Sequence, residues 1–429
     1  MRSANRGNGN NVTYVNANGN CNNNNANNGN RSAADCAGIG HGGVHEVIVV
    51  RKHHGTRSLL PECESLEQYG GDGHALRDVG PISAISPEDV IGFDALWDCM
   101  ELCKSGVLWK GSVSSFYMNA PERIARMSDE LRNGTYRHGR TTTFTVTHPK
   151  RREIVAQTFR DRVYHRSIVE NLLVPVVFPR LIYDNAACQK GKGTDFARER
   201  LRRFLREQHR RHGPGGHVLM MDVRKYYDSM RHDVVEGMFE DMLPGWGASM
   251  VIDALRAHYP GDVGYSPGSS IVQVAGISVL NGIDHRIKER MGIRGYSRYM
   301  DDLRLIHQDR AHLERCRDEI SGMLAEIGFE THPTKTVIVP MSETIPYLGF
   351  DFSVTETGKV LMLVNASSPK QMRRKVGRLA KLEMSGERPD GTTRQVYEGW
   401  RAHAKKGDSR SLIRRCDQWY EDLWRDNRC

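Results

Sequence analysis

Long apolar runs are missing from this chain of 429 residues, and a helix needs roughly 18 apolar residues in a row to cross a bilayer. The N-terminus also lacks the apolar core of an export signal. The nine cysteines include no Cys-x-x-Cys pair, and their odd number argues against a disulfide framework or a zinc knuckle. Cys99 and Cys103 are spaced for one face of a buried helix. These absences predict a cytoplasmic protein without a membrane partner.

Core-forming residues are scarce at the N-terminus, where asparagine dominates. Residues 1–30 hold fourteen asparagines, a residue that disfavours the interiors of helices and strands. Such a segment offers little apolar surface to offset the entropy lost on ordering. We therefore expect residues 1–42 to be a disordered tail. The pattern leaves the structure of residues 43–85 open, and a globular pattern begins at Ser86.

Positive charge exceeds negative charge along the chain. The 61 Lys and Arg residues outnumber the 52 Asp and Glu residues, for a net charge of +9. Two segments, 198–212 and 370–382, are especially basic. Each segment alone fits a solvated helix face, but with the net charge they predict a polyanionic partner such as nucleic acid.

The globular part reads as a mixture of helices and hairpins. Capping and helical spacing predict helices, whereas apolar–polar alternation around turns predicts hairpins. The expected helices are 86–106, 121–134, 162–182, 196–210, one long helix after a loop within 264–292, and a basic helical tail from 368; the expected hairpins are 141–159, 297–307 and 345–364, and a buried strand is expected at 217–222.

Three aspartates stand at the ends or turns of these expected strands. Asp222 closes an apolar run typical of a buried strand, and Asp301 and Asp302 lie at the turn of the hairpin 297–307. Nucleotidyl transfer with two metal ions needs carboxylates from neighbouring strands to meet at one point. Magnesium prefers such oxygen ligands, so the three aspartates are candidate metal ligands.

From about Leu131 to Phe352 the sequence resembles the reverse transcriptase family, with its motifs in order. Residues 131–168 resemble the fingers segment, NAACQKGKGTDFARERL the template-facing motif, and MMDVRKYYDSM and RYMDDL the two catalytic palm motifs. The resemblance implies an α+β, right-hand polymerase fold, with fingers, a palm of antiparallel sheet with helices, and a short helical thumb. The implied boundaries are 86–212 for the fingers, 213–364 for the palm and 365–429 for the thumb.

The same resemblance implies roles for residues of the active site. Lys335, within IGFETHPTKT, would protonate the leaving pyrophosphate. Two Mg²⁺ ions, with Mn²⁺ as a substitute, would be held by Asp222, Val223, Asp301 and Asp302.

Further roles concern the substrates. Lys150 and Arg152 would contact the incoming triphosphate, since cations neutralise phosphate charge. Tyr227 would exclude a ribose 2′-hydroxyl by its bulk. The primer grip is implied within PYLGF, at Tyr347, Leu348 and Gly349.

The loop before LNGIDHRIKER is similar to the IGxxxSQ pattern of diversity-generating retroelement enzymes and related bacterial groups. Gly268 and Gln273 match the pattern, whereas Val272 replaces its serine and Pro267 sits one residue late. Gln273 would contact the nascent base pair, at a position associated in the family with relaxed fidelity at template adenines.

These features predict an RNA-directed DNA polymerase of a diversity-generating retroelement, which copies template RNA into adenine-mutated cDNA. Its partners would be template RNA, primer and cDNA product, deoxynucleoside triphosphates and a small basic accessory protein. One alternative is an antiphage-defence or retron-like reverse transcriptase, which shares nearly all the palm motifs. Another is an inactive RNA-binding scaffold, which predicts loss of at least one of the three aspartates, and all three are present.

The asparagine tract offers a separate clue to the subfamily. Asparagine is encoded only by AAC or AAT, so the tract is written in adenine-rich nucleic acid. It also resembles the Asn-rich terminal repeat of the lectin-like target proteins of diversity-generating retroelements. We therefore interpret residues 5–36 as translated template repeat.

Overall fold

The computed structural model describes residues 85–147 and 151–425. The predictions for the tail 1–42, for nearly all of the extension 43–85, and for Lys150 lie outside these residues. Within them, no helix is both long enough and apolar enough to cross a membrane.

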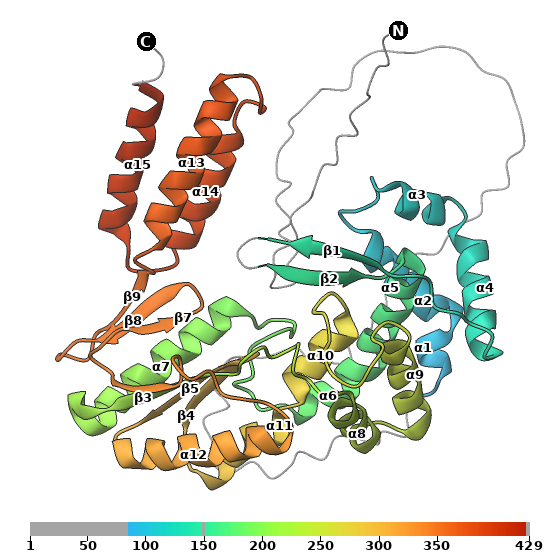
Figure 1. Ribbon diagram of the computed structural model, residues 1–429, viewed down its shortest axis with the longest axis horizontal. Helices are drawn as coiled ribbons and strands as arrows, with labels where there is room; N and C mark the ends of the chain where they lie inside the picture. The colour runs from blue at the N-terminus through green and yellow to red at the C-terminus, as the bar shows by residue number, and fades with distance from the viewer. Residues whose placement is uncertain (1–84, 148–150, 426–429) are drawn as a thin grey trace, which may run out of the picture. The chain divides into compact units, whose positions relative to one another are not determined.

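The first part of the described chain is a group of helices around a shared apolar core (Figure 1). Ser86 is the second described residue, and both its backbone N–H and its hydroxyl donate to the Asp89 carboxylate at 2.8 Å. The capping pattern expected from the sequence is therefore only half formed, because the N-cap residue of the first helix is Pro87, with no side-chain cap. Cys99 is buried and Cys103 half-buried in one helix. The helices are α1 (Glu88–Ile91), α2 (Phe93–Lys104), α3 (Gly111–Met118), α4 (Ala120–Arg132) and α5 (Phe159–Ile168).

A two-stranded antiparallel hairpin lies between α4 and α5. Its strands are β1 (Thr142–Val146) and β2 (Arg152–Ala156), with Thr142 opposite Ala156. The hairpin predicted at 141–159 is thus confirmed. Ser266 joins it to the loop before α10, because its hydroxyl accepts from the Val155 N–H at 3.1 Å and donates to the Glu153 carbonyl at 3.2 Å.

After α5 the helical path is irregular. A π-helical turn (Val169–Leu173), α6 (Val174–Val177) and a 3₁₀ turn (Phe178–Arg180) complete the segment expected as one amphipathic helix. Pro175 and Pro179 lie in the last two pieces, and proline cannot donate a helical hydrogen bond. The long basic helix α7 (Thr194–His212) follows.

The central sheet is four-stranded and wholly antiparallel, in the order β4-β5-β3-β6. Alternate residues of its middle strands enter two different cores: Leu219 and Met221 pack with α12, whereas Val218 and Met220 pack with α7. The two helices therefore cover opposite faces (Figure 1). The elements are β3 (His217–Asp222), β4 (Gly295–Tyr299), β5 (Asp302–His307), β6 (Val337–Pro340) and α12 (Arg310–Glu326).

The connection from β3 to β4 is helical. Its pieces are α8 (His232–Met242), α9 (Gly245–Arg256), α10 (Ser270–Ser278), α11 (Asn281–His285) and a π-helical turn (Arg286–Arg290). The single long helix predicted here is wrong, since the chain leaves helical geometry at Leu280, with φ −96° and ψ 10°. Asn281 and Gly282 follow the break, and both residue types favour helix interiors poorly.

A second antiparallel sheet has three strands, β7 (Ile345–Tyr347), β8 (Phe350–Val354) and β9 (Val360–Val364). The hairpin predicted at 345–364 is therefore two consecutive hairpins. Beyond it stand the C-terminal helices α13 (Ser368–Met384), α14 (Thr392–Ala404) and α15 (Arg410–Arg425), which share a small core of their own.

The turn between α14 and α15 is fastened to the rest of the fold. The Asp408 carboxylate accepts from the Met362 N–H at 3.0 Å and from Arg202 at 2.9 Å. Ser409 accepts from the Val364 N–H at 3.0 Å. The base of the helical bundle is thus bonded both to β9 and to α7.

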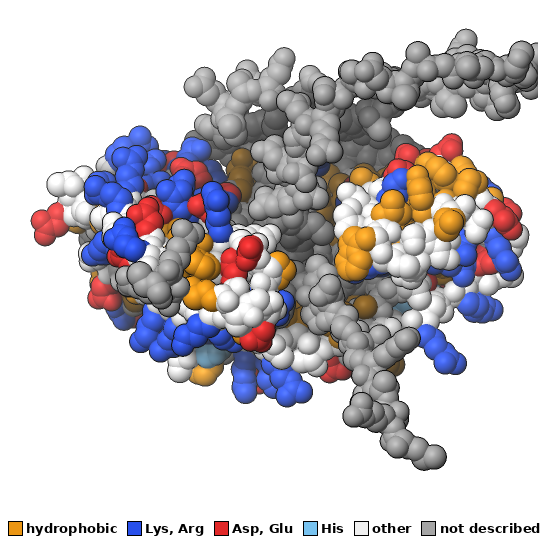
Figure 2. All heavy atoms as spheres, turned by 90° about the horizontal axis from the view of Figure 1, so that it is seen from above, with side chains coloured by type: hydrophobic (Ala, Val, Ile, Leu, Met, Phe, Trp, Pro, Cys, Tyr) orange, Lys and Arg blue, Asp and Glu red, His pale blue; other side chains and the backbone are white. Residues whose placement is uncertain are grey.

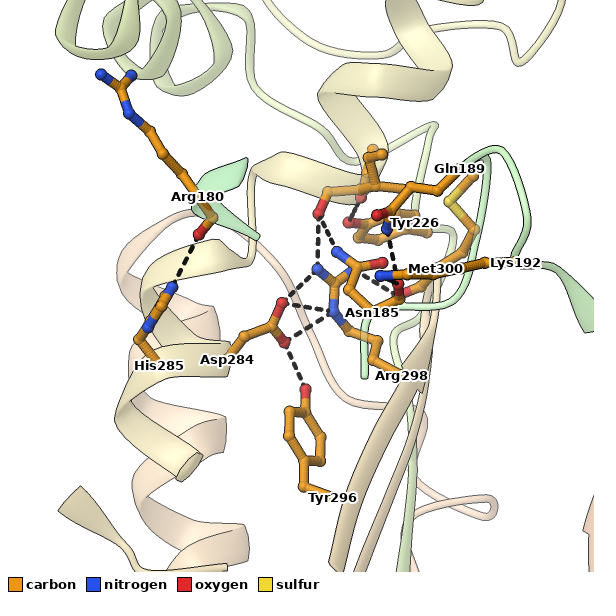
Figure 3. Close-up of polar contacts among 12 residues, drawn as sticks. Arg180, Asn185, Gln189, Lys192, Tyr226, Asp284, His285, Tyr296, Arg298 and Met300 are labelled. Carbon is orange, nitrogen blue, oxygen red and sulfur yellow. Dashed lines mark hydrogen bonds and ion pairs between the residues drawn. The ribbon is translucent and has the colours of Figure 1, made fainter. Parts of the chain in front are cut away.

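A buried ion pair links the sheet to the helical connection (Figure 3). Arg298 on β4 and Asp284 on α11 are both fully buried, with Nε to Oδ1 at 2.8 Å and Nη2 to Oδ2 at 2.5 Å. The Tyr296 hydroxyl donates to the same carboxylate at 2.6 Å. Arg298 also donates to the Ile277 carbonyl at 2.7 Å and to the Met300 carbonyl at 3.1 Å.

Two more segments of the chain, 185–186 and the one that contains Tyr226, hydrogen-bond to the same cluster. Asn185 donates to the Ile277 carbonyl at 2.8 Å, and the Ala186 N–H donates to the Arg298 carbonyl at 3.0 Å. Tyr226 donates its hydroxyl to the Gly276 carbonyl at 2.5 Å. Residues far apart in the sequence are therefore joined by one hydrogen-bonded cluster next to the turn after β4.

Because Asp284→Asn removes the buried counter-charge of Arg298, we expect this variant to lose about 3–5 kcal/mol of unfolding free energy. Urea denaturation followed by circular dichroism measures the change. Asp241→Asn, at an exposed position on α8, is the matched control and should stay within about 0.5 kcal/mol of wild type. Equal stability of the two variants would contradict a structural role for the pair.

Candidate active site

Strand pairing brings the three predicted aspartates to one edge of the central sheet. Asp222, the last residue of β3, stands opposite Asp302, the first residue of β5. Tyr299 pairs with Asp302 across a two-residue turn made of Met300 and Asp301. The Val223 N–H donates to the Asp301 carbonyl at 3.1 Å, so the chain after β3 is fixed against this turn.

The turn itself is strained. Met300 has a φ of 57°, in the left-handed region that favours glycine, which costs a non-glycine residue on the order of 1–3 kcal/mol. The hydrogen bond from buried Arg298 to the Met300 carbonyl holds this conformation. Because this hydrogen bond holds the turn in one conformation, it also sets the direction in which Asp301 and Asp302 leave the turn.

The electrostatics of the carboxylates favour a bound cation. Burial raises the pKa of Asp301 to about 6, and the charges of Asp222 and Asp302 add to the shift. Burial also raises the pKa of Asp302, against the effect of Arg304. Crowded, partly desolvated carboxylates repel one another until a cation joins them.

Two of the carboxylates are paired with cationic side chains. Asp222 lies 2.9 and 3.0 Å from Lys335 Nζ, and Asp302 pairs with Arg304. A divalent metal ion, of the kind that the family uses, would neutralise the charge that remains where the three carboxylates meet. Oxygen donors of this type suit such an ion, and Asp222, Asp301, Asp302 and the main chain of Val223 are the residues that would hold it.

A cleft of about 390 Å³ is lined both by the edge of the central sheet that carries Asp222 and Asp302 and by the turn predicted as the primer grip. Asp222, Asp302 and Lys335 line this cleft, and so does the segment 346–350. Leu348 and Gly349 form the turn between β7 and β8, with φ of 47° and 86°. Positive φ at both central positions is typical of a type I′ hairpin turn.

Two arginines that sequence reasoning missed support this turn. Arg304 pairs with Asp302, donates to the Pro346 carbonyl at 2.6 Å and lies over the Tyr347 ring at 4.9 Å. Arg198 on α7 donates to the Leu348 carbonyl at 2.9 Å. The signal for Arg304 was present, since a charged residue inside the apolar strand LRLI needs a buried partner.

Tyr227 lies beside the turn made of Met300 and Asp301. Its hydroxyl is 3.6 Å from the Met300 sulfur, and its ring packs on Gly276, where an added Cβ would come within 2.9 Å of the hydroxyl. Burial raises the pKa of Tyr227 well above its usual value, against the effect of the Arg152 guanidinium. Arg152 is exposed at the start of β2 and is close enough to act on this site.

Gly268 lies against the hairpin, and Gln273 lies five residues further along the chain. A Cβ on Gly268 would come within 2.7 Å of the Val155 carbonyl of β2, so only glycine allows this approach. Gln273, near the start of α10, donates to the Pro267 carbonyl at 3.4 Å. Its side-chain oxygen lies 4.0 Å from the Cys188 sulfur.

Residues 147–352 match the family model described as reverse transcriptase (RNA-dependent DNA polymerase). No curated protein matches in sequence.

Similar solved structures include two yeast telomerases. One, from Candida albicans in complex with a TWJ fragment of telomeric RNA, has 12% identity and a TM-score of 0.41, covering 66% of this chain and 54% of that one. The other, apo telomerase from Candida tropicalis truncated from its C-terminal domain, has 13% identity and a TM-score of 0.39, covering 52% and 54%. The chain thus spans about half the length of these structures.

The matched residues run from the β1–β2 hairpin through both catalytic strands to β8. They include the three aspartates, Lys335 and the turn at Leu348. The predicted right-hand polymerase fold is confirmed, and residues 147–352 are similar to the reverse transcriptase (RNA-dependent DNA polymerase) domain.

Proposed function

We propose that the chain is an RNA-directed DNA polymerase, which extends a primer 3′ end with deoxynucleotides on a template RNA. The observation that carries the proposal is the shared cleft, where the Asp222–Asp302 pair faces the turn at Leu348. Metal-bound carboxylates and a primer-positioning turn on one cleft are what nucleotidyl transfer requires.

The side chains of the cleft have distinct roles in this proposal. Asp222, Asp301 and Asp302, with the Val223 main chain, would hold Mg²⁺, or Mn²⁺ as a substitute. Such ions would supply activation of the primer hydroxyl and neutralisation of charge on the leaving pyrophosphate. Lys335 lies beside Asp222 and is the proton donor to the pyrophosphate.

Substrate selection falls to the residues around β2 and α10. Arg152 and Lys150 contact the triphosphate, and Tyr227 closes the space that a ribose 2′-hydroxyl would need. Gly268 lets the hairpin approach the template side, and Gln273 contacts the nascent pair. In this scheme residues 86–212 are the fingers and residues 213–364 the palm.

The helices α13–α15 form the thumb, residues 365–429. Figure 2, where these helices lie at the left, shows Lys and Arg side chains gathered over them. The exposed basic residues of α13 are Lys370, Arg373, Arg374, Lys375, Arg378 and Lys381. Such a surface binds the phosphates of a template–product duplex without reading its sequence.

For the biological setting we propose a diversity-generating retroelement, acting in the cytoplasm with a small basic accessory protein. Its support is the Asn-rich tract and the IGxxxSQ-like loop with Gln273. The enzyme would then make cDNA that is mutated at template adenines.

Removing a metal ligand tests the catalytic assignment. Asp301→Asn should abolish primer extension on an RNA template, because a neutral amide binds Mg²⁺ poorly. RNA binding, measured by mobility shift, should be unchanged. Asp241→Asn is the control and should extend primers at the wild-type rate, while normal extension by Asp301→Asn would refute the metal site.

Arg304 tests the link between the carboxylates and the primer grip. Arg304→Met removes a charged hydrogen-bond donor from Asp302 and from Pro346, so we expect primer extension to slow by roughly 10- to 100-fold, the equivalent of about 1.5–3 kcal/mol. Single-turnover extension rates measure this. Arg310→Met, at an exposed site on α12, is the control, and equal rates would remove Arg304 from the site.

Fidelity tests the retroelement assignment. Sequenced cDNA made by the wild-type enzyme should carry errors concentrated opposite template adenines, and Gln273→Ala should change this error spectrum. Gln395→Ala, exposed on α14, should leave it unchanged. Uniform errors over the four template bases would instead favour a defence or retron-like enzyme.

A further inference from the structure

Three histidine rings, none of them hydrogen-bonded or ion-paired with the three aspartates of the candidate active site within the described residues, meet at one point. His138 follows α4, His165 lies on α5, and His258 comes just after α9. One ring nitrogen from each lies within 4.8 Å of the others. The ring centroids are 5.0, 5.2 and 5.6 Å apart. Three segments far apart in the sequence thus present imidazoles to one point.

Two of the rings are buried without hydrogen-bond partners. His165 is 1% exposed and His258 5% exposed. Within the described residues, neither nitrogen of either ring has a hydrogen-bond partner. Leaving a buried polar group unsatisfied costs about 1–3 kcal/mol. Four such nitrogens in one place call for a ligand that satisfies more than one of them.

The buried rings of His165 and His258 are in the neutral form, which can bind a metal ion. Burial, and the neighbouring rings of His258 and His138, lower the pKa of His165 to about 3. Burial also lowers the pKa of His258. Both imidazoles are therefore neutral at physiological pH, and the neutral ring is the form that binds metal ions.

We propose that His138, His165 and His258 bind a transition-metal ion of the zinc class. Imidazole nitrogen is a preferred ligand of Zn²⁺, and three histidines are a known ligand set. Zn–N bonds of about 2.0–2.1 Å place tetrahedral ligand atoms about 3.4 Å apart. Nitrogens already within 4.8 Å reach that spacing by small side-chain rotations.

Asp161 supplies the supporting contact that such sites use. It is fully buried, one helical turn before His165, and its carboxylate lies 3.5 Å from Nδ1 of His138. It accepts from the Tyr136 hydroxyl at 2.9 Å and from the Thr158 hydroxyl at 2.6 Å. A carboxylate held in this way fixes a histidine's tautomer and turns its other nitrogen to the metal.

The fourth ligand position is open to water. Asp161 is already engaged by hydrogen-bond donors, and the His138 side chain is 16% exposed, so solvent reaches the site from that side. The metal would tie the loop before β1 to α5 and to the end of α9. Its role is to stabilise the base of the hairpin, and it needs no part of the polymerase reaction.

Metal content of the full-length protein tests the site. Elemental analysis after purification and gel filtration should find one zinc per chain, and His138→Gln, the least buried position, should lose it. His212→Gln, exposed at the end of α7, is the matched control and should keep it. Asp301→Asn should also keep it, which separates this ion from the catalytic ions.

Cobalt provides a readout that does not depend on the variants. Co²⁺ added to metal-free wild-type protein should give the visible absorption of a tetrahedral complex, and Zn²⁺ should abolish it by competition. Thermal unfolding of the wild type should occur at a lower temperature after zinc removal. Purified protein without zinc and without a cobalt spectrum, or equal zinc in His138→Gln, would show that the rings only pack together.

Discussion

The buried pair of Arg298 and Asp284 is the contact on which the catalytic edge depends. A buried charge without a partner is strongly destabilising, so β4 and α11 cannot separate without a large cost. The same guanidinium bonds the carbonyls of Ile277 and Met300. It thereby joins the helix that carries Gln273 to the turn that carries Asp301.

From that contact the geometry of the cleft follows in steps. The strained Met300 turn can persist because Arg298 holds its carbonyl, and the strand register then sets Asp302 opposite Asp222. Arg304, two residues further along β5, carries the connection to the turn at Leu348. The positions of Asp302 and of the turn at Leu348 are therefore both set by β5, with little freedom between them.

The strands and the aspartates were predictable because they are local signals: an apolar run ending in Asp222, and two aspartates in a tight turn. The break before Asn281 was missed, since apolar spacing continues across it and only the poor helix formers mark it. The roles of Arg198 and Arg304 depend on neighbours about 150 and 40 residues away, and the histidine cluster joins segments with no shared spacing. No pattern within one segment of the sequence reveals contacts with residues so far away along the chain.

The hydrogen bonds of Asp408 and Ser409 restrict how the three C-terminal helices can move relative to the sheets. Their base is hydrogen-bonded to β9 and to α7, so the bundle cannot rotate as a rigid body about its base. We expect it to bend most at the end far from these bonds and least next to them. In the proposed function, the basic side chains toward the end of α13 would follow a duplex of varying width, while the turn at Leu348 stays at a constant distance from Asp222 and Asp302.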